Sequence, residues 1–348
     1  MKKLLLTFAA ALLVSFFASA QKKYSVYAVG FYNQENLFDT CHDEGKKDYD
    51  FLPNGSYHWD GLKYSHKLHN MARALADMGT DVLPNVGCAM IGLSEVENAK
   101  VLTDLVNQPA LKARNMQFVH IEGPDKRGID CAMLYNPALF KLESDTLYQY
   151  VQELEKDSAF KTRGFLTIHG RLADEPVTVI VCHWPSRFSG SFYRESAARQ
   201  VKAIKDELLK KNPERKIFVV GDMNDDPVDK SMYQILGAKP EISKVKDGDM
   251  YNPWYNLLAK QGVGTLSYNG AWNLFDQIVM TPNLLDRAGK KDFSKLTFWK
   301  HAIQRMPYLF QTEGKYKGTP KRTTAGGVWL DGYSDHLPVC VYLVKEQK

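Results

Sequence analysis

The sequence predicts an α/β fold in which two β-sheets pack face to face and helices cover their outer sides. Short apolar runs recur along the whole chain, and several are apolar on both faces, as expected for strands that another layer covers. Two longer segments instead place apolar residues at helical spacing. Many strands with a few helices between them are typical of a layered α/β sandwich.

The strands are expected, in chain order, at residues 25–33, 87–95, 116–122, 129–135, 164–172, 177–184, 216–224, 275–281 and 337–344. Helices are expected at 62–78, where apolar residues from Leu68 to Ala76 share one face, and at 191–211, where the same holds from Ala197 to Leu209. The chain has no internal repeat, low-complexity tract or Pro/Ser-rich linker. Residues 21–348 are therefore expected to form a single domain.

Residues 1–20 have the pattern of a bacterial signal peptide. Lys2 and Lys3 give a short basic start, residues 4–17 are apolar, and Ala18-Ser19-Ala20 fits an A-x-A cleavage site. The apolar run is shorter than the roughly 20 residues of a membrane span, and no second run of spanning length follows. We expect this segment to be cleaved and the mature chain to be exported to the periplasm or beyond the cell. The mature chain is not expected to be an integral membrane protein. An uncleaved N-terminal anchor is the alternative.

The charge balance neither demands nor excludes a polyanionic partner. The chain has 45 Lys and Arg against 40 Asp and Glu, and its formal charge of +5 becomes +3 once Lys2 and Lys3 are removed. The 5 cysteines show no C-x-x-C spacing, so a zinc site is not expected. Most lie in or beside apolar segments, which favours buried free thiols with room for one pair. No clear signal for a stable protein partner is present.

Polar residues repeatedly follow the end of an expected strand. They are Asn33 and Glu35; Glu95; His183, followed by Ser186 and Arg187; Asp222 and Asn224; and, just before the last strand, Asp335 and His336. Strand ends held by a rigid sheet present catalytic groups well. Carboxylates, amides and histidines together suit a site that holds a hard cation and activates water, and oxygen ligands favour magnesium, manganese or calcium over zinc.

Each of these residues also has an ordinary structural explanation. Residues 222–227 can form a simple turn, because Asp, Asn and Pro favour turns. Glu95 can be a solvated strand end, His183 a satisfied core histidine, and Asp335 a cap of the last strand. The combination is more specific than any of its members.

The same segments resemble the endonuclease/exonuclease/phosphatase superfamily, which includes exonuclease III-type repair nucleases, pancreatic-type deoxyribonucleases, bacterial sphingomyelinases and inositol polyphosphate 5-phosphatases. In order they read FYNQENLF, IGLSEVEN, HWPSR, GDMNDDP, FDQIVM and SDHLPV. The resemblance implies a four-layer α/β sandwich of two packed, mostly antiparallel sheets flanked by helices. Ser94 departs from the pattern, since relatives commonly have Gln there. NQENLFD, SEVEN and KRGIDCAMLYNP are most similar to secreted bacterial nucleases, whereas HWPSR also resembles phosphatase branches.

The resemblance implies a metal site. Glu95 would be the main ligand of Mg²⁺ or Mn²⁺, with Ca²⁺ as a further candidate. Asn33, Glu35 and Asp335 would complete or orient the ligand shell. The ion would polarise the phosphoryl oxygen and stabilise developing charge.

The resemblance also implies catalytic roles. Asp222 would position or deprotonate the attacking water, and Asn224 would hold the phosphate. His336, paired with Asp276, would transfer a proton or act as a cation, because an aspartate partner fixes the tautomer of a histidine and raises its pKa. His183 would protonate the leaving oxygen. The general base is assigned differently among relatives, so Asp222 and His336 both remain candidates.

Two arginines are candidate phosphate clamps, since a guanidinium matches phosphate oxygens. They are Arg127 and Arg187, with Ser186 beside the latter in the same motif. A structural ion pair, for example of Arg127 with Asp130, is the alternative interpretation.

A basic insertion is expected near 284–326, because this stretch is longer than the superfamily needs to reach its last strand. From Arg287 to Arg322 it is rich in Lys and Arg, with Phe298, Trp299, Tyr308, Phe310 and Tyr316 interleaved. Such a pattern can bind a nucleic-acid backbone and stack bases. The alternative is a solvated loop with an amphipathic helix near 298–310 that packs on the core.

These observations support a secreted, metal-dependent phosphoesterase, with a nuclease acting on DNA or RNA as the first hypothesis. The alternative is a phosphatase or phosphodiesterase for inositol phosphates, sphingolipids or other small phosphoesters, because substrate choice depends on loops around a shared core. A non-catalytic binding module is a third interpretation. It is disfavoured because Glu95, Asp222, Asn224, Asp335 and His336 are all retained.

Overall fold

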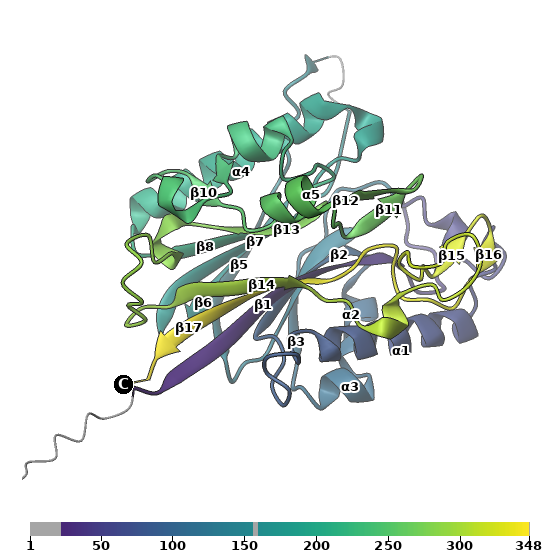
Figure 1. Cartoon of the computed structure of the whole chain (residues 1–348). Coiled ribbons are helices and arrows are strands. Elements are labelled where there is room, and N and C mark those ends of the chain that lie inside the picture. The colour runs from purple at the N-terminus through teal and green to yellow at the C-terminus, as the bar shows by residue number, and fades with distance from the viewer. Residues whose placement is uncertain (1–21, 156–158, 348) are drawn as a thin grey trace, which may run out of the picture.

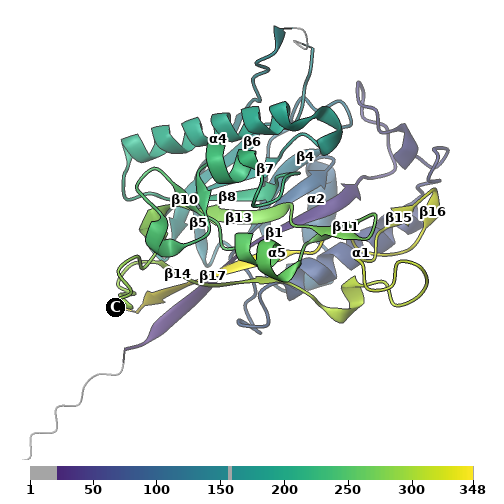
Figure 2. The same ribbon diagram turned by 45° about the horizontal axis from the view of Figure 1, so that its top comes forward.

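The computed structural model describes residues 22–155 and 159–347, and it has the layered architecture that the sequence predicts. Two large sheets pack face to face. Helix α4 (Ser191–Lys211) covers one outer side, and α1 (Gly61–Asp77), α2 (Ala99–Val106) and α3 (Pro109–Lys112) cover the other (Figure 1). The view turned by 45° shows α4 lying across the top of its sheet (Figure 2). The expected signal peptide lies outside the described residues.

The first sheet has six strands in the order β14-β17-β1-β2-β4-β3. They are β14 (Thr297–Ile303), β17 (Val339–Glu346), β1 (Tyr24–Leu37), β2 (Met90–Val96), β4 (Asp130–Tyr135) and β3 (Gln117–His120). Only the β1–β2 pair in this sheet is parallel. The last long strand, β17, therefore lies inside the sheet, between the first strand and β14.

The second sheet has seven strands in the order β5-β6-β7-β8-β13-β10-β9. They are β5 (Phe140–Tyr148), β6 (Phe165–Leu172), β7 (Glu175–His183), β8 (Lys216–Asp222), β13 (Asp276–Met280), β10 (Met250–Tyr251) and β9 (Ala238–Lys239). Its central pair β7–β8 is parallel, whereas β8 and β13 are antiparallel. Smaller elements are α5 (Tyr255–Gln261) and the hairpins β11–β12 (Leu266–Tyr268, Ala271–Asn273) and β15–β16 (Thr324–Ala325, Val328–Trp329).

Alternation along the strands builds the core. In β1, Val29 and Phe31 face the second sheet, where they join Val181 and Val220, while Ala28 and its alternate neighbours face the α1 layer. Gly92 of β2 permits close approach of the sheets, since a Cβ there would lie 2.6 Å from a methyl of Val220. The site described below is thus held by strands that are buried on both faces.

Each segment expected to be a strand contains one in the structure, and both expected helices are confirmed as α1 and α4. The amphipathic helix proposed near 298–310 is wrong, because residues 297–303 instead form β14 and pair with β17. Strand β5 was not anticipated. It is an edge strand, and most of its side chains are exposed, so it lacks the apolar run that marks the others.

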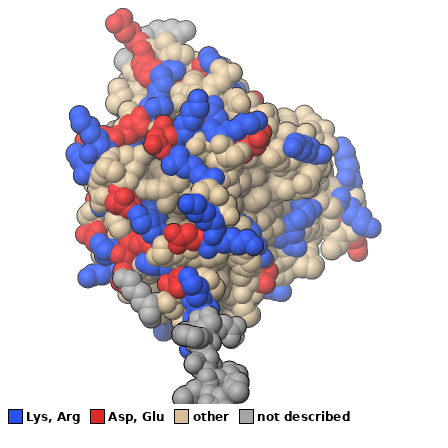
Figure 3. Space-filling view, turned by 60° about the vertical axis from the view of Figure 1, so that its left-hand side comes forward, with Lys and Arg blue, Asp and Glu red and all other residues tan. Residues whose placement is uncertain are grey.

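The mixed surface charge and the burial of most cysteines agree with the predictions from the sequence. On the face shown in Figure 3, Lys and Arg are interspersed with Asp and Glu. Cys41 is exposed and the other cysteines are buried, with the sulfur atoms of Cys88 and Cys340 3.5 Å apart. Among the described residues, no helix is long and apolar enough to cross a membrane.

Candidate active site

The two parallel pairs at the sheet centres bring the polar strand ends together. Strands β1 and β2 run side by side and carry Asn33 and Glu95 near their C-terminal ends, while β7 and β8 end at His183 and Asp222. The antiparallel neighbour β13 begins at Asp276, directly opposite Asp222. Parallel neighbours end at the same edge of a sheet, so each pair delivers two functional groups to one place.

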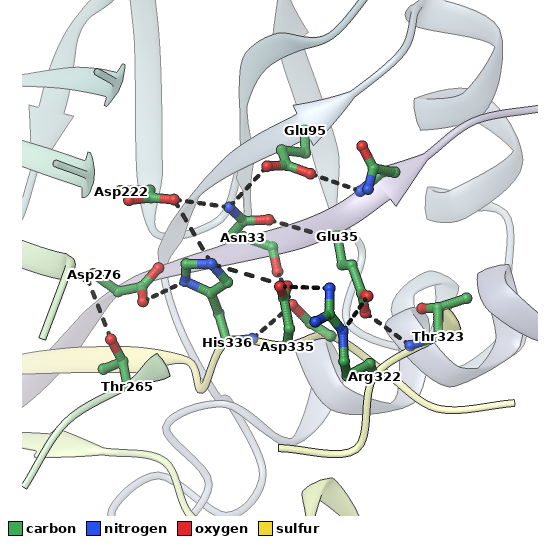
Figure 4. A network of polar contacts seen from close by, with 12 residues as sticks. Asn33, Glu35, Glu95, Asp222, Thr265, Asp276, Arg322, Thr323, Asp335 and His336 are labelled. Atoms are coloured by element: carbon green, nitrogen blue, oxygen red, sulfur yellow. Dashed lines mark hydrogen bonds and ion pairs between the residues drawn. The ribbon is translucent and has the colours of Figure 1, made fainter. Parts of the chain in front are cut away.

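Asn33 joins the two sheets at this edge. Its Nδ2 donates to Asp222 Oδ2 at 3.0 Å and lies 3.4 Å from Glu95 Oε1 (Figure 4). Asn33 and Asp222 are buried and lie 189 positions apart in the sequence. The backbone N–H of Asn36 donates to the other oxygen of Glu95 at 2.9 Å. Asn33 thus fixes two carboxylates that the sequence places on different sheets.

His336 and Asp276 form a buried pair. His336 Nδ1 lies 2.7 Å from Asp276 Oδ2, and Nε2 points toward Asp222 Oδ2 at 3.8 Å and Asp335 Oδ1 at 3.9 Å (Figure 4). Burial disfavours the charged ring, but Asp276, Asp335 and Asp222 outweigh it and raise the pKa of His336 well above its usual value. These carboxylates therefore favour the protonated form of the ring.

Burial disfavours the charged forms of Asp222 and His183. Burial raises the pKa of Asp222 to about 6, although His336 opposes that change. Burial also lowers the pKa of His183 well below its usual value, with help from Arg163 and Arg127. His183 Nε2 lies 3.8 Å from Glu95 Oε1 and 3.7 Å from Asp222 Oδ2. His183 is thus a neutral imidazole between two carboxylates.

Glu35 and Asp335 share an arginine that the sequence did not single out for this place. Arg322 Nε lies 3.1 Å from Glu35 Oε1, and its Nη2 lies 3.0 Å from Asp335 Oδ2. The backbone N–H of Thr323 donates to the second oxygen of Glu35 at 2.7 Å (Figure 4). Burial and Asp335 raise the pKa of Glu35 to about 7, with Lys67 and Arg322 acting against them.

Several residues at this edge have a strained backbone. Glu35, Asn36, Glu95 and Asn224 all have positive φ, between 45° and 60°. Non-glycine residues seldom adopt such angles, and a glutamate gains no local compensation there. Strained residues of this kind persist where the surrounding structure enforces them, typically at functional sites. The strain is a second observation, independent of the side chains, that marks these strand ends.

The remaining predicted residues lie around the rim. Asn224 donates to Trp184 O at 2.9 Å, and its backbone N–H donates to Asp222 Oδ1. Arg187 is 44% exposed and pairs with Asp226 and Asp229, both at 2.9 Å. Ser186, beside it, is exposed.

Arg127 is also exposed, and it donates to Asn36 Oδ1 at 2.5 Å. The proposed pair of Arg127 with Asp130 is not formed in the structure, since Asp130 instead meets His120 at 3.1 Å and accepts from Gly123 N. Arg127, from the loop between β3 and β4, thus bonds to the strained turn whose Asn36 N–H holds Glu95.

Three basic residues of the neighbourhood were missed. Besides Arg322, they are Lys67, which is fully buried in α1, and Arg163, which pairs with Asp125 at 3.1 Å and donates to Trp184 O. Neither Lys67 nor Arg163 belongs to a recognisable motif. In the sequence, the one signal for Lys67 is its place on the helical face that Leu68 and Met71 make apolar.

The residues fit a hard divalent cation. Glu95 and Asp335 offer carboxylate oxygens, the donor type that Mg²⁺ and Mn²⁺ take. Asn33 was also predicted as a ligand, but it turns its Nδ2 toward Glu95 and Asp222, while its Oδ1 accepts from Glu35 N at 2.8 Å. Asp276 Oδ1 is buried without a hydrogen-bond partner among the described residues. Among the described residues, two groups of side chains are close enough to share an ion: Asp222, Asp276 and His336, and His120, Glu122 and Asp130. The carboxylates around His336 favour its protonated form, which cannot ligate a metal ion.

Solved structures of other proteins share this fold. Structural neighbours include a complex of D. rerio TDP2 with single-strand DNA product (14% identity, TM-score 0.53, 92% of this chain and 99% of that chain). A mannosyl-6-phosphatase of Bacteroides thetaiotaomicron VPI-5482 has 13% identity, a TM-score of 0.55 and coverage of 91% and 99%. ANGEL2, a 2′,3′-cyclic phosphatase, has 11% identity, a TM-score of 0.58 and coverage of 93% and 97%.

At such low identity these neighbours show a shared fold alone. No curated protein matches the chain. A family model described as the Endonuclease/Exonuclease/phosphatase family matches residues 28–345, nearly all of the described chain. The chain therefore belongs to the endonuclease/exonuclease/phosphatase family, whose members hydrolyse phosphoester bonds.

Proposed function

We propose that this protein is a divalent-metal-dependent phosphodiesterase and that its substrate is DNA or RNA. The observation that carries the proposal is the bridge of Asn33 between Glu95 and Asp222, with the His336–Asp276 pair beside it. These groups combine oxygen ligands, a carboxylate base and a cation within one buried edge. Hydrolysis of a phosphodiester needs all three.

Glu95 and Asp335 would hold the ion, and Asn33 would orient the Glu95 carboxylate through its Nδ2. Glu35 is held beside them. When bound, Mg²⁺ or Mn²⁺ supplies Lewis-acid polarisation of the phosphoryl oxygen. The chain's own residues would handle the protons. Asp222 is suited to accept a proton from water, because its pKa of about 6 is close to the working pH of a general base.

The histidines would then have distinct roles. Asp276, Asp335 and Asp222 raise the pKa of His336 and favour its protonated form, so it would hold a developing negative charge. His183 is neutral and would donate a hydrogen bond to a phosphate oxygen. This division favours Asp222 over His336 as general base.

Two exposed aromatic side chains support a polynucleotide substrate. Phe188 is fully exposed in the segment that follows β7 and His183. Tyr268 is 69% exposed at the end of β11, whose Leu266 pairs with His336 in an isolated bridge. Exposed rings beside a phosphate site can stack on unpaired bases, and base stacking on aromatics is sequence-tolerant.

A substrate panel tests this proposal. The purified protein would be incubated with plasmid DNA, single-stranded RNA, bis-p-nitrophenyl phosphate, p-nitrophenyl phosphate, inositol polyphosphates and sphingomyelin, each with Mg²⁺, Mn²⁺ or EDTA. We expect cleavage of nucleic acid and of the diester, and we expect EDTA to abolish it. Hydrolysis of small phosphoesters with nucleic acids left intact would replace the nuclease proposal with the phosphatase alternative. Hydrolysis that persists in EDTA would contradict metal dependence.

We also propose that the protein is exported after removal of residues 1–20. The basic start, the apolar run and the Ala18-Ser19-Ala20 site support this proposal. Full-length protein expressed in a bacterial host should be recovered outside the cytoplasm with an N-terminus near Gln21, as measured by intact mass and N-terminal peptide mapping. Changing Ala18 and Ala20 to bulky residues should block processing. Recovery of the unprocessed wild-type chain from the cytoplasm would contradict export.

A further inference from the structure

We propose that Arg322 is the guanidinium that binds the phosphate of the substrate and that Glu35 is the positioning residue that holds it; the phosphate role rests on the function proposed above. The Arg322 side chain is 48% exposed, while that of Glu35, which holds its Nε, is 3% exposed. A guanidinium has more N–H donors than its contacts with Glu35 and Asp335 use. The Nε and Nη2 edge of the Arg322 guanidinium is therefore held by Glu35 and Asp335, while its other N–H groups face the solvent at the site.

The segment that carries Arg322 is itself firmly held. Thr323 N donates to Glu35, and the buried Lys67 Nζ donates to Thr323 Oγ1 at 2.5 Å and to Tyr333 O at 2.6 Å. Gly332 allows the returning chain to pass closely, since a Cβ there would lie 2.0 Å from Arg322 O. Groups held by such supporting contacts keep a fixed geometry, as a substrate contact requires.

Glu35 is better suited to anchoring than to binding a metal ion. Arg322 and Thr323 N occupy its two oxygens, one each. It is also more buried than the carboxylates of Glu95 and Asp335, whose side chains are 14% and 22% exposed. Because both of its oxygens are bonded, the Glu35 carboxylate is itself fixed, and its bond to Nε fixes the orientation of the Arg322 guanidinium. A planar contact with a phosphate group requires such a fixed orientation.

The other arginines of the rim bond to different parts of the site. Arg187 forms ion pairs with the carboxylates of the segment after β8, and Arg127 bonds to an amide. Arg322 instead meets Asp335, the residue that precedes His336. Its free donors therefore lie beside Asp335 and His336, where a phosphate oxygen would bind.

The test compares Arg322→Ala, Arg322→Lys, Glu35→Gln and the double variant Arg322→Ala/Glu35→Gln. Four quantities are measured: kcat and KM for bis-p-nitrophenyl phosphate, the inhibition constant of inorganic phosphate, and Mn²⁺ affinity by electron paramagnetic resonance. Lys210→Ala, an exposed change at the far end of α4, is the charge-matched control. Circular dichroism melting verifies that each variant folds.

We expect Arg322→Ala to raise KM and the phosphate inhibition constant by about tenfold or more, the scale of a lost charge-assisted hydrogen bond. Mn²⁺ affinity should change by less than about twofold, because no ligand is lost. Arg322→Lys should restore part of the loss, and free guanidinium at non-denaturing concentration should partly rescue the alanine variant. Glu35→Gln should reproduce the KM defect, and the double variant should be no worse than Arg322→Ala, since both changes remove one contact.

Specific outcomes would overturn the inference. Wild-type KM and phosphate inhibition in Arg322→Ala would remove the phosphate role. A large loss of Mn²⁺ affinity in Glu35→Gln would make Glu35 a metal ligand and not an anchor. Failure of the proposed function is distinguishable: if the wild-type protein hydrolyses no phosphoester, calorimetric binding of inorganic phosphate to wild type and Arg322→Ala still decides whether Arg322 binds phosphate.

Discussion

Glu95→Gln should reduce phosphoester hydrolysis by about 10³-fold at moderate Mg²⁺ concentration, because several kcal/mol of transition-state stabilisation depend on the ion. Glutamine keeps the size of the side chain and an acceptor for Asn36 N, but it removes the charge that attracts the cation. The measurement is initial rate on bis-p-nitrophenyl phosphate over a Mg²⁺ titration, together with Mn²⁺ binding by electron paramagnetic resonance. Mn²⁺ affinity should fall with the rate.

Glu97→Gln is the matched control, on the same stretch of chain two residues further on. Glu97 is buried and accepts a hydrogen bond from Asp39 N at 2.7 Å, which glutamine can also accept. Burial raises the pKa of Glu97 to about 8, so the substitution removes little charge near neutral pH. The control should keep near-wild-type rates. Near-wild-type turnover of Glu95→Gln at saturating Mg²⁺ would show that Glu95 is not the main ligand.

Asp222→Asn should lower kcat by about 10²–10⁴-fold, the usual contribution of a positioned general base. Asparagine cannot accept a proton from water, and its NH2 group would face the donor of either Asn33 or Asn224, which bond to different oxygens of Asp222. Because Asp222 is proposed as base and not as ligand, Mn²⁺ affinity should remain within a few-fold. Steady-state kinetics on the diester and the same Mn²⁺ titration separate the two quantities.

Asp145→Asn provides the control for loss of one carboxylate. Asp145 is an exposed residue of the edge strand β5, which β6 and β7 separate from β8 in the second sheet. It should leave both kcat and metal binding unchanged. A tenfold or larger loss of Mn²⁺ affinity in Asp222→Asn, with kcat restored by excess metal, would reassign Asp222 to the ligand shell.

The sequence was sufficient to predict the layers and the strand ends that make the site. The strands that carry Asn33, Glu95, His183 and Asp222 are buried on both faces, so each is a distinct apolar run with a polar end. Because these strands are buried, both the fold and the candidate residues could be predicted from the sequence. The roles of these residues stay predictions, since neither the structure nor the comparisons test them.

The contacts from the inserted segment could not be predicted in the same way. Arg322 reaches Glu35 across 287 positions, and nothing in the local pattern of a basic stretch distinguishes it from its exposed neighbours. The same stretch begins with β14, whose side chains are mostly half-buried and which the aromatic spacing wrongly suggested to be helical. Pairing with β17 overrode that local preference.

The position of β17 inside the first sheet has a consequence for biosynthesis. Until residues 339–346 leave the ribosome, one side of β1 lacks the partner with which it pairs from Tyr24 to Phe31. An unpaired apolar strand is prone to intermolecular pairing. The segment that completes the sheet also follows directly on His336. We therefore expect the nascent chain to be prone to intermolecular pairing through β1 until residues 339–346 are synthesised, the stage at which chaperones would protect this strand.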